Sequence, residues 1–316
     1  MPNKESQCCE KFKTMIGGQA LIEGIMMRGP DKDAVVIRSG DGLTVETSPR
    51  KKNPAGSVKN WLFIRGVFNF FDSQVVGVKA LLRSADLAPE EMQEEPSKFD
   101  LWLEKKLGNE KFQQAILGVA VAMGLGLSVV LFFLLPMVIS SFFDRWIPNT
   151  VVLNLVEGIL RMGIFMVYML AISRMGEMKR LFSYHGAEHK TIRCYEAGLP
   201  LTVENVRAQT RLHPRCGTSF LLVVIVVSIL VNSVVRLDNS FARMGAHLLL
   251  LPVVVGISYE INRWCGRHDN WLSAALSAPG KWLQHMTTNE PDDSMIECAI
   301  RAMELVIPEE KGSDAW

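Results

Sequence analysis

The chain has 316 residues, of which 48% are apolar, and a formal net charge of +1 at pH 7. Because basic and acidic side chains balance, the composition excludes the strongly basic class of nucleic-acid-binding proteins. The apolar residues gather in four long stretches, which predict an α-helical polytopic membrane protein with the lipid bilayer as its partner. Residues 1–16 lack the apolar core of a signal peptide.

Residues 1–57 are predicted to be a small cytosolic segment that contains β-structure. Gly17–Gly24 predicts a loop that leads into a strand. The runs Ala34–Ser39 and Leu43–Thr47 flank Gly40 to Gly42, and two such runs around a glycine-containing loop predict a hairpin. We therefore expect a β-rich segment ahead of the helices.

Residues 58–112 are predicted to form cytosolic or interfacial helices. Trp61 to Ser84 carries a dense group of aromatic and aliphatic side chains, with basic residues spaced along it. This stretch is too charged to span a bilayer and too aromatic to face only water. Two interpretations stay open: a helix in the plane of the inner leaflet, or a helix that packs on other parts of the protein.

Residues 113–261 are predicted to be a four-helix membrane domain. About 20 apolar residues cross a bilayer as a helix, and four stretches approach or exceed that length. They are Gln114–Phe143, Val151–Ser173, Gly217–Val235 and about Ser240–Ile261. The fourth stretch is the weakest candidate span, because charged residues at both ends shorten its apolar part.

Two charged residues lie inside the second stretch, Glu157 and Arg161, four positions apart. An unpaired charge there costs roughly 2.5–3.5 kcal/mol on insertion scales, so we expect the two side chains to pair. The pair either stabilises the helix bundle or belongs to a polar track for a transported ion.

Basic residues predict the orientation in the membrane. The loop 174–217 carries eight Lys and Arg, and such loops favour the cytosolic side. We therefore expect a multi-pass protein of the cell (inner) membrane with both termini and this loop in the cytosol. All six cysteines then lie on the cytosolic side, where disulfides are disfavoured. Residues 262–316 predict a cytosolic helical segment, in which Asp292 and Asp293 suit a helix start.

The sequence Tyr184 to His189 carries the strongest sign of chemistry. On a helix, His185 and His189 lie four residues apart and share one face, with Glu188 beside them. The pattern His-x-x-Glu-His is one in which two histidines hold zinc and the glutamate acts as a base. The alternative is a polar helix surface near the membrane, without a metal.

A catalytic zinc site needs at least one further protein ligand. His213 and Cys216 are the best sources on the same predicted face, although they also suit a capping turn before the third span. Glu260, at the end of the fourth span, is another candidate, with pairing to Arg263 as the alternative. Cys265, His268 and Asp269 form a weaker candidate cluster.

Five stretches of the chain resemble the YqhQ-like family of bacterial membrane proteins, a family of unknown function. The resemblance extends over most of the chain, with conservative departures at Leu21 and Ile25, and Asn289 where a basic residue is expected. The matching stretches are Gly17–Pro30, Tyr184–Thr191, His213–Phe220, Ser258–Glu260 and Thr287–Asp293.

This resemblance implies a metal-dependent enzyme and adds Gly17–Pro30 to the site. Glu23 and Arg28, in that stretch, are then expected to reach the metal or an anionic group of the substrate. Neither residue would be chosen from composition alone.

Together these features predict a metal-dependent hydrolase at the cytosolic face of the inner membrane, with a divalent metal, zinc first. His185 and His189 hold the metal, with His213, Cys216 or Glu260 completing the shell. Glu188 accepts a proton from a water molecule that the metal activates. The alternative is a non-catalytic, metal-stabilised membrane scaffold or assembly factor, or an ion transporter. The candidates for contacts with substrate or an anion are Glu23, Arg28, Arg193 and Arg215. The sequence names neither the substrate nor a protein partner.

Overall fold

A computed structural model describes residues 12–40, 42–50, 54, 56–87, 109–143, 145–235, 237, 239–268, 270–310 and 312–315. The chain forms two compact units built from segments that are not consecutive. The first, here the sheet unit, comprises Met1–Ala88, Met169–Val227 and Pro252–Trp316. The second, here the helical unit, comprises Pro89–Tyr168 and Ser228–Leu251.

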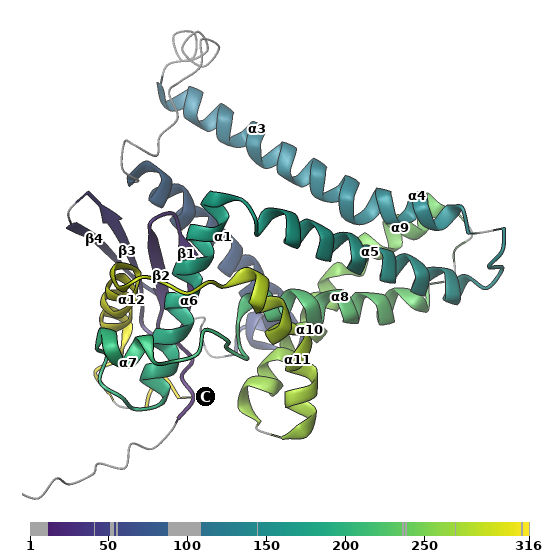
Figure 1. Cartoon of the computed structure of the whole chain (residues 1–316). Helices are drawn as coiled ribbons and strands as arrows, with labels where there is room; N and C mark the ends of the chain where they lie inside the picture. The colour runs from purple at the N-terminus through teal and green to yellow at the C-terminus, as the bar shows by residue number, and fades with distance from the viewer. Residues whose placement is uncertain are drawn as a thin grey trace, which may run out of the picture. The chain divides into compact units, whose positions relative to one another are not determined.

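The sheet unit contains a four-stranded antiparallel meander in the order β1-β2-β3-β4 (Figure 1). Its strands are β1 (Gly17–Leu21), β2 (Gly24–Arg28), β3 (Lys32–Ser39) and β4 (Gly42–Pro49). The predicted hairpin is confirmed by the pairing of β3 with β4, in which Gly40 takes a positive φ of 56°. Glycine adopts that conformation at little steric cost, so the tight turn is possible.

The prediction for Gly17–Gly24 was wrong in detail. Instead of one loop and one strand, β1 and β2 form a second hairpin whose register pairs Leu21 with Gly24. Its turn contains Glu23 at a φ of 52°, a conformation that non-glycine residues seldom adopt. Sequence rules predict such turns from Gly, Asn or Asp, so a glutamate in that position is not recognised as part of a turn.

The two faces of the sheet pack against different helices. On one face lie α6 (Gly176–Glu196) and α12 (Asp293–Val306), which contact each other and the strands. The other face meets α1 (Ile64–Leu87). Since side chains alternate along a strand, Ile25 and Met27 enter the α6–α12 core while Met26 joins the cluster with α1.

Among the described residues, five further helices lie wholly or mostly in the sheet unit. The first two are the 3-10 turn η1 (Val58–Asn60) and α7 (Val203–Arg207), and the next two are α8 (Gly217–Ser233) and α10 (Leu251–Arg267). The last is α11 (Trp271–Thr287), with Asn270 in a capping box at its start. The predicted helix start near Asp292 is confirmed, since its carboxylate accepts the Met295 N–H as the N-cap of α12.

The helical unit is built from α3 (Asn109–Val129), the single π-helical turn η3 (Val130–Leu134), α4 (Leu135–Ser141), α5 (Thr150–Ile172) and α9 (Ser240–Leu249). The last residues of α5 belong to the sheet unit, and the last residues of α8 to the helical unit. At the contact of α5 with α8, Gly158 lies so close to Ile229 that a Cβ would come within 2.5 Å of its Cγ1.

Two of the described helices are long and apolar enough to cross a membrane, Gly118–Ser141 and Val151–Ile172. A third is possible if Ala242–Leu249 and Leu251–Arg267, which bend by 41° at their junction, form one broken span. Gly217–Ser233 is apolar but shorter. The chain is therefore a mostly helical protein with two or three candidate spans and a small N-terminal antiparallel sheet, and the count of four spans stays a prediction.

Candidate metal centre

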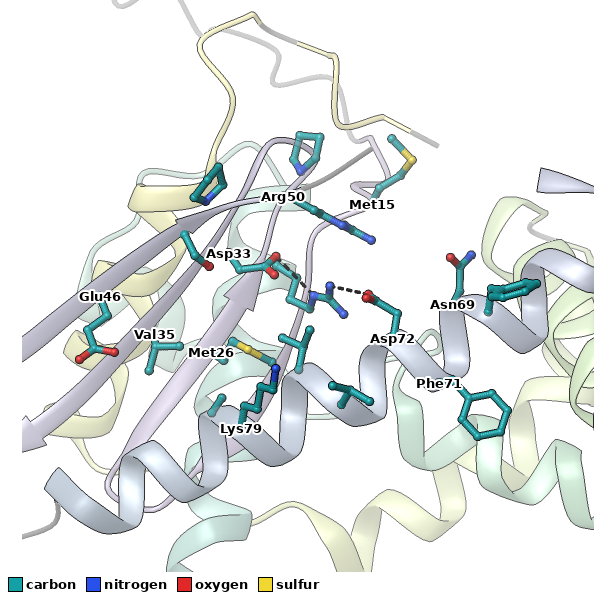
Figure 2. Close-up of a pocket in the computed structure, with 18 of the residues that line it drawn as sticks. Met15, Met26, Asp33, Val35, Glu46, Arg50, Asn69, Phe71, Asp72 and Lys79 are labelled. Carbon is teal, nitrogen blue, oxygen red and sulfur yellow. Dashed lines mark hydrogen bonds and ion pairs between the residues drawn. The ribbon is translucent and has the colours of Figure 1, made fainter. Parts of the chain in front are cut away.

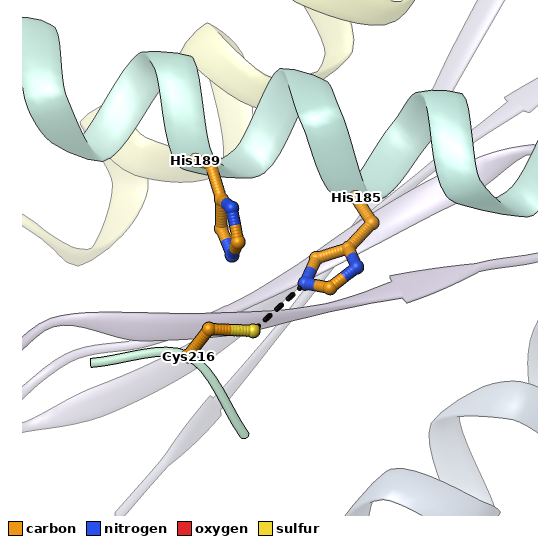
Figure 3. Close-up of side chains that lie close together, drawn as sticks. All are labelled: His185, His189 and Cys216. Atoms are coloured by element: carbon orange, nitrogen blue, oxygen red, sulfur yellow. Dashed lines mark hydrogen bonds between the residues drawn. The ribbon is translucent and has the colours of Figure 1, made fainter. Parts of the chain in front are cut away.

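Three side chains with metal-binding atoms converge beside the sheet: His185, His189 and Cys216 (Figure 3). One ligand atom from each lies within 4.8 Å of the others, and His185 Nε2 is 3.1 Å from Cys216 Sγ. The two histidines come from adjacent turns of α6, and the cysteine directly precedes α8. Within the described part of the chain this is the one such group of three.

Main-chain carbonyl groups orient both imidazole rings. His185 Nδ1 lies 2.8 Å from the Thr287 carbonyl oxygen, and His189 Nδ1 lies 2.5 Å from that of Arg211. A carbonyl oxygen only accepts, so each Nδ1 donates its proton. Such second contacts are typical of metal-bound histidines, because they fix the tautomer that leaves Nε2 as the ligand.

The Nε2 atom of His189 is buried without a hydrogen-bond partner, and the side chain is 1% exposed. Most buried polar atoms in proteins have a partner, so such an atom needs an explanation. A metal ion bound by His189 together with His185 and Cys216 satisfies it. The residues present therefore fit a metal.

The thiol of Cys216 is positioned by the start of α8. The Thr218 N–H donates to its sulfur at 3.4 Å, and the Thr218 hydroxyl lies at 3.1 Å. Burial acts to raise the pKa of the thiol, but the positive charge of His185 and its contact with the sulfur lower that pKa well below 9.0. The thiolate is the form of cysteine that binds metals.

The pKa of His185 responds to the same contact. Burial acts to lower it, whereas the Cys216 thiolate and Glu188 raise it to about 9. The contact between His185 and Cys216 thus favours the charged form of both side chains. A divalent cation would displace the proton of the His185 imidazolium and neutralise the charge of the Cys216 thiolate.

Glu188 lies beside this group, 5% exposed, on the same helix. Its carboxylate accepts the Gly18 N–H of β1, while Oε2 has no hydrogen-bond partner. Burial raises the pKa of Glu188, although the charge of His185 opposes the shift. A carboxyl group in such surroundings holds a proton more readily than an exposed one.

Gly18 is the residue that allows β1 to approach so closely. A Cβ at this position would lie 2.9 Å from Glu188 Cδ and 2.8 Å from the Met26 carbonyl oxygen. Any side chain would displace the carboxylate or the strand. The stretch Gly17–Pro30 therefore touches the site, through a main-chain N–H and the lack of a side chain at Gly18.

His213 lies outside the group of ligand atoms. Its Nε2 is 3.3 Å from Glu196 Oε2, and its main chain is bound by the Gln284 side chain. Its ring remains next to His189, with the centroids 5.7 Å apart. Burial, helped by the charge of Arg193, lowers the pKa of His213 to about 4, so it is neutral near pH 7.

Glu260 also lies elsewhere. It accepts two hydrogen bonds from Arg65, the second residue of α1, one of them from Nε at 2.7 Å. Its expected role in the metal shell is therefore corrected to an ion pair with Arg65. In the weaker cluster, His268 stacks on Trp264, and Asp269 lies outside the described residues.

The arginines predicted to meet an anion bind other groups. Arg193 donates to the Leu212 carbonyl at 2.8 Å. Arg215 pairs with Glu196 and donates to the Thr14 carbonyl at 2.9 Å. Both side chains therefore hold the segment that leads to Cys216.

Glu23 and Arg28 do not reach the ligand atoms. Glu23 pairs with Arg180 and accepts a hydrogen bond from the Tyr184 hydroxyl at 3.1 Å. Arg28 faces a different hollow of about 1160 Å³ between the sheet and α1, where it pairs with Asp33 and Asp72 (Figure 2). These residues support the fold around the site.

Sequence reasoning missed the groups that orient the site. The roles of the Thr287 and Arg211 carbonyl groups cannot be predicted from residue type, because every residue has a main-chain carbonyl. Gly18 was the detectable signal, since a glycine inside a strand often marks a close approach of the backbone. Asn289 shows a similar contact, because its carbonyl lies against Gly186, where a Cβ would come within 2.0 Å.

Comparisons with known proteins identify the family. Residues 61–309 match the family described as "Protein of unknown function (DUF1385)". The chain is also 34% identical over 295 residues to "Uncharacterized protein YqhQ" of Bacillus subtilis (strain 168), a match that covers 92% of each chain. No solved structure matches the chain. Both matches extend over most of the sequence, and the chain therefore belongs to the DUF1385 family of YqhQ-like proteins, whose function is unknown.

Proposed function

We propose that this protein is a metal-dependent hydrolase, with zinc as the metal, at the cytosolic face of the cell membrane. One observation carries the proposal: His185, His189 and Cys216 offer ligand atoms within 4.8 Å of one another, with the buried carboxylate of Glu188 beside them. A protein core does not need a thiol, two imidazoles and a carboxylate side by side for packing, so their presence in one buried place favours a ligand-binding role.

The donor set favours zinc. Two imidazole nitrogens and one thiolate suit zinc, whereas magnesium and calcium prefer oxygen ligands. Three protein ligands leave a fourth tetrahedral position open, which is typical of catalytic rather than structural zinc sites. When bound, the metal supplies a Lewis acid that polarises a carbonyl or phosphoryl oxygen and makes water a better nucleophile.

Glu188 serves as the proton acceptor in this proposal. The Gly18 N–H holds its carboxylate in place, and Oε2 is left without a partner. That oxygen is therefore available to take a proton from the attacking water and deliver it to the leaving group. The substrate is an ester, amide or similar acyl compound, or a lipid headgroup with such a bond.

The location at the membrane rests on the apolar helices. Two or three of them are long enough to span a bilayer, and the site-bearing segment 174–217 carries eight basic residues. Basic loops favour the cytosolic side. These features support a reaction on the cytosolic side, with both termini there as well.

A non-catalytic role is the second candidate. The cluster ties together α6, the residue before α8 and, through the Thr287 carbonyl, the end of α11. A metal at this point would therefore cross-link these three segments, as expected of a metal-stabilised scaffold or assembly factor. In that role Glu188 would not take part in proton transfer.

The substitution Glu188→Gln separates the two candidates. We would purify the wild type, Glu188→Gln and the exposed control Glu177→Gln from the same helix, measure zinc per chain, and assay a panel of esters and amides. Catalysis predicts that Glu188→Gln keeps its zinc but loses activity by roughly 100-fold or more. Loss of zinc would make Glu188 a ligand, and wild-type activity with full zinc would exclude the proton-acceptor role.

A further inference from the structure

A second buried polar cluster lies in the helical unit, here called the polar core. It consists of Glu157 and Arg161 on α5 and Arg243 and His247 on α9, all between 3% and 8% exposed. In each helix the two residues are four positions apart, so they share one face. Two faces of charged or titratable side chains thus meet inside an apolar bundle.

Glu157 lies at the centre of the polar core. Its Oε1 is 3.0 Å from Arg161 Nη2, which confirms the expected pairing, and 3.8 Å from His247 Nδ1. Its Oε2 is 3.7 Å from Arg243 Nε. Arg161 also donates from Nε to the Phe132 carbonyl at 2.7 Å. One carboxylate therefore serves two guanidinium groups and an imidazole.

The charges of the polar core do not balance. Arginine stays protonated in proteins, so Arg161 and Arg243 contribute two positive charges. Among the described residues, Glu157 is the one carboxylate within 4 Å of either guanidinium. The cluster therefore carries a net charge of at least +1. An uncompensated charge in an apolar interior is costly, and a bound counter-ion removes that cost.

Unpartnered polar atoms mark where a counter-ion fits. Arg243 is 3% exposed, and its Nη2 has no hydrogen-bond partner; the same holds for His247 Nε2. Nearby, Asn154 donates to the Asn232 and Val235 carbonyls, and the Oδ1 atoms of Asn154 and Asn232 lack partners. A buried guanidinium N–H without an acceptor attracts an anion.

We propose that the polar core binds one small monovalent inorganic anion, of the size and charge of chloride, on the Arg243 side of Glu157. The anion brings the net charge of the two arginines and one carboxylate to zero and accepts the hydrogen bond of Arg243 Nη2. This site is separate in residues and in chemistry from the metal cluster, so it stands whether or not the protein is a hydrolase.

Calorimetry on the purified full-length protein in detergent micelles tests the proposal. Sodium chloride is titrated into protein kept in sodium gluconate, an organic anion much larger than chloride, at constant ionic strength. The wild type is expected to bind chloride, and Arg243→Gln to bind it roughly tenfold more weakly or not at all. The matched control is Arg301→Gln, an exposed arginine of α12, which is expected to bind as the wild type does.

A second variant keeps the test decisive if Arg243→Gln does not fold. Glu157→Gln removes the competing negative charge, so it is expected to bind chloride roughly tenfold more tightly than the wild type. Absence of chloride binding by the wild type would overturn the proposal. Equal binding by Arg243→Gln and the wild type, or no gain in affinity in Glu157→Gln, would also overturn it.

Discussion

The metal cluster of the sheet unit and the polar core of the helical unit both bury polar atoms that have no hydrogen-bond partner, but the charged groups around those atoms differ. In the metal cluster, His189 Nε2 and Glu188 Oε2 lie close to a thiolate. In the polar core, Arg243 Nη2 belongs to a cluster of two guanidinium groups and one carboxylate. Thiolate and imidazole nitrogens bind cations, whereas an excess of guanidinium charge binds an anion. The comparison thus assigns opposite charges to the two ligands.

The two regions also differ in how their side chains are held. Main-chain groups orient the metal cluster, through the carbonyl groups of Thr287 and Arg211 and the Gly18 N–H. In the polar core, most of the contacts run between charged side chains. Main-chain partners fix geometry more firmly than long side chains, which suits a site that performs chemistry.

The largest expected effect comes from His185→Ala combined with His189→Ala. Removing two of three ligands should reduce bound zinc from about one per chain to about none. Elemental analysis of the purified protein checks this, with the exposed His285→Ala as control. If the two regions are independent, chloride binding by the double variant should match the wild type. A double variant that retains its zinc would show that His185 and His189 are not the zinc ligands.

Gly18→Ala should have the next largest effect. The new Cβ would meet backbone and the Glu188 carboxyl at under 3.0 Å, so we expect a loss of about 1–3 kcal/mol in the free energy of unfolding. Activity should fall with it, because Glu188 is displaced. Gly17→Ala is the matched control, since nothing lies within 4 Å of its Cβ. Chemical denaturation of both variants measures the difference, and equal stability would contradict the close approach.

Gly158→Ala tests the packing that surrounds the polar core. Its Cβ would come within 2.5 Å of the Ile229 side chain, which can shift more easily than backbone. We therefore expect a smaller loss, near the lower end of about 1–3 kcal/mol. Gly163→Ala, with open space at its Cβ, should instead gain a few tenths to about 1 kcal/mol from helix propensity. Thermal unfolding in micelles compares the pair, and a stabilised Gly158→Ala would contradict the contact of α5 with α8.

Tyr184→Phe should have the smallest effect. The variant removes one buried hydrogen bond to Glu23 and leaves the ring in place, so about 1 kcal/mol of stability should be lost. The metal content should not change, because Tyr184 supports the sheet and not the ligands. Tyr168→Phe, at a partly exposed position, should be neutral within about 0.5 kcal/mol. Loss of zinc from Tyr184→Phe would show that the Glu23 network and the metal cluster are coupled.

The sequence predicted those parts of the fold and the site that depend on local spacing. His185, Glu188 and His189 share a helix face because of their separation in the chain, and Asp292 caps α12 because of its place before an apolar helix. The pairing of Glu157 with Arg161 followed from the same rule. Cys216 was one of three candidate third ligands, and it is the one that the fold brings to the histidines.

What escaped prediction depends on contacts between distant segments. Glu260 meets Arg65, 195 positions away, and nothing in the local sequence of either residue indicates the other. The turn at Glu23 holds a rare backbone conformation with support from Arg180 and Tyr184, far along the chain. His213 is only a few residues from Cys216, but Gln284 and Glu196 turn it away from the ligand group.

The bridge between Thr14 and Ala315 has a consequence for how the protein is made. Thr14 binds Asp314 through its hydroxyl and accepts a hydrogen bond from Arg215, the neighbour of Cys216. During translation, Cys216 leaves the ribosome well before Asp314 is synthesised. The nascent chain therefore carries this thiol before the segment around it is fully anchored, and an exposed thiol in that state is open to oxidation. Oxidants should thus damage the newly made chain more readily than the folded protein.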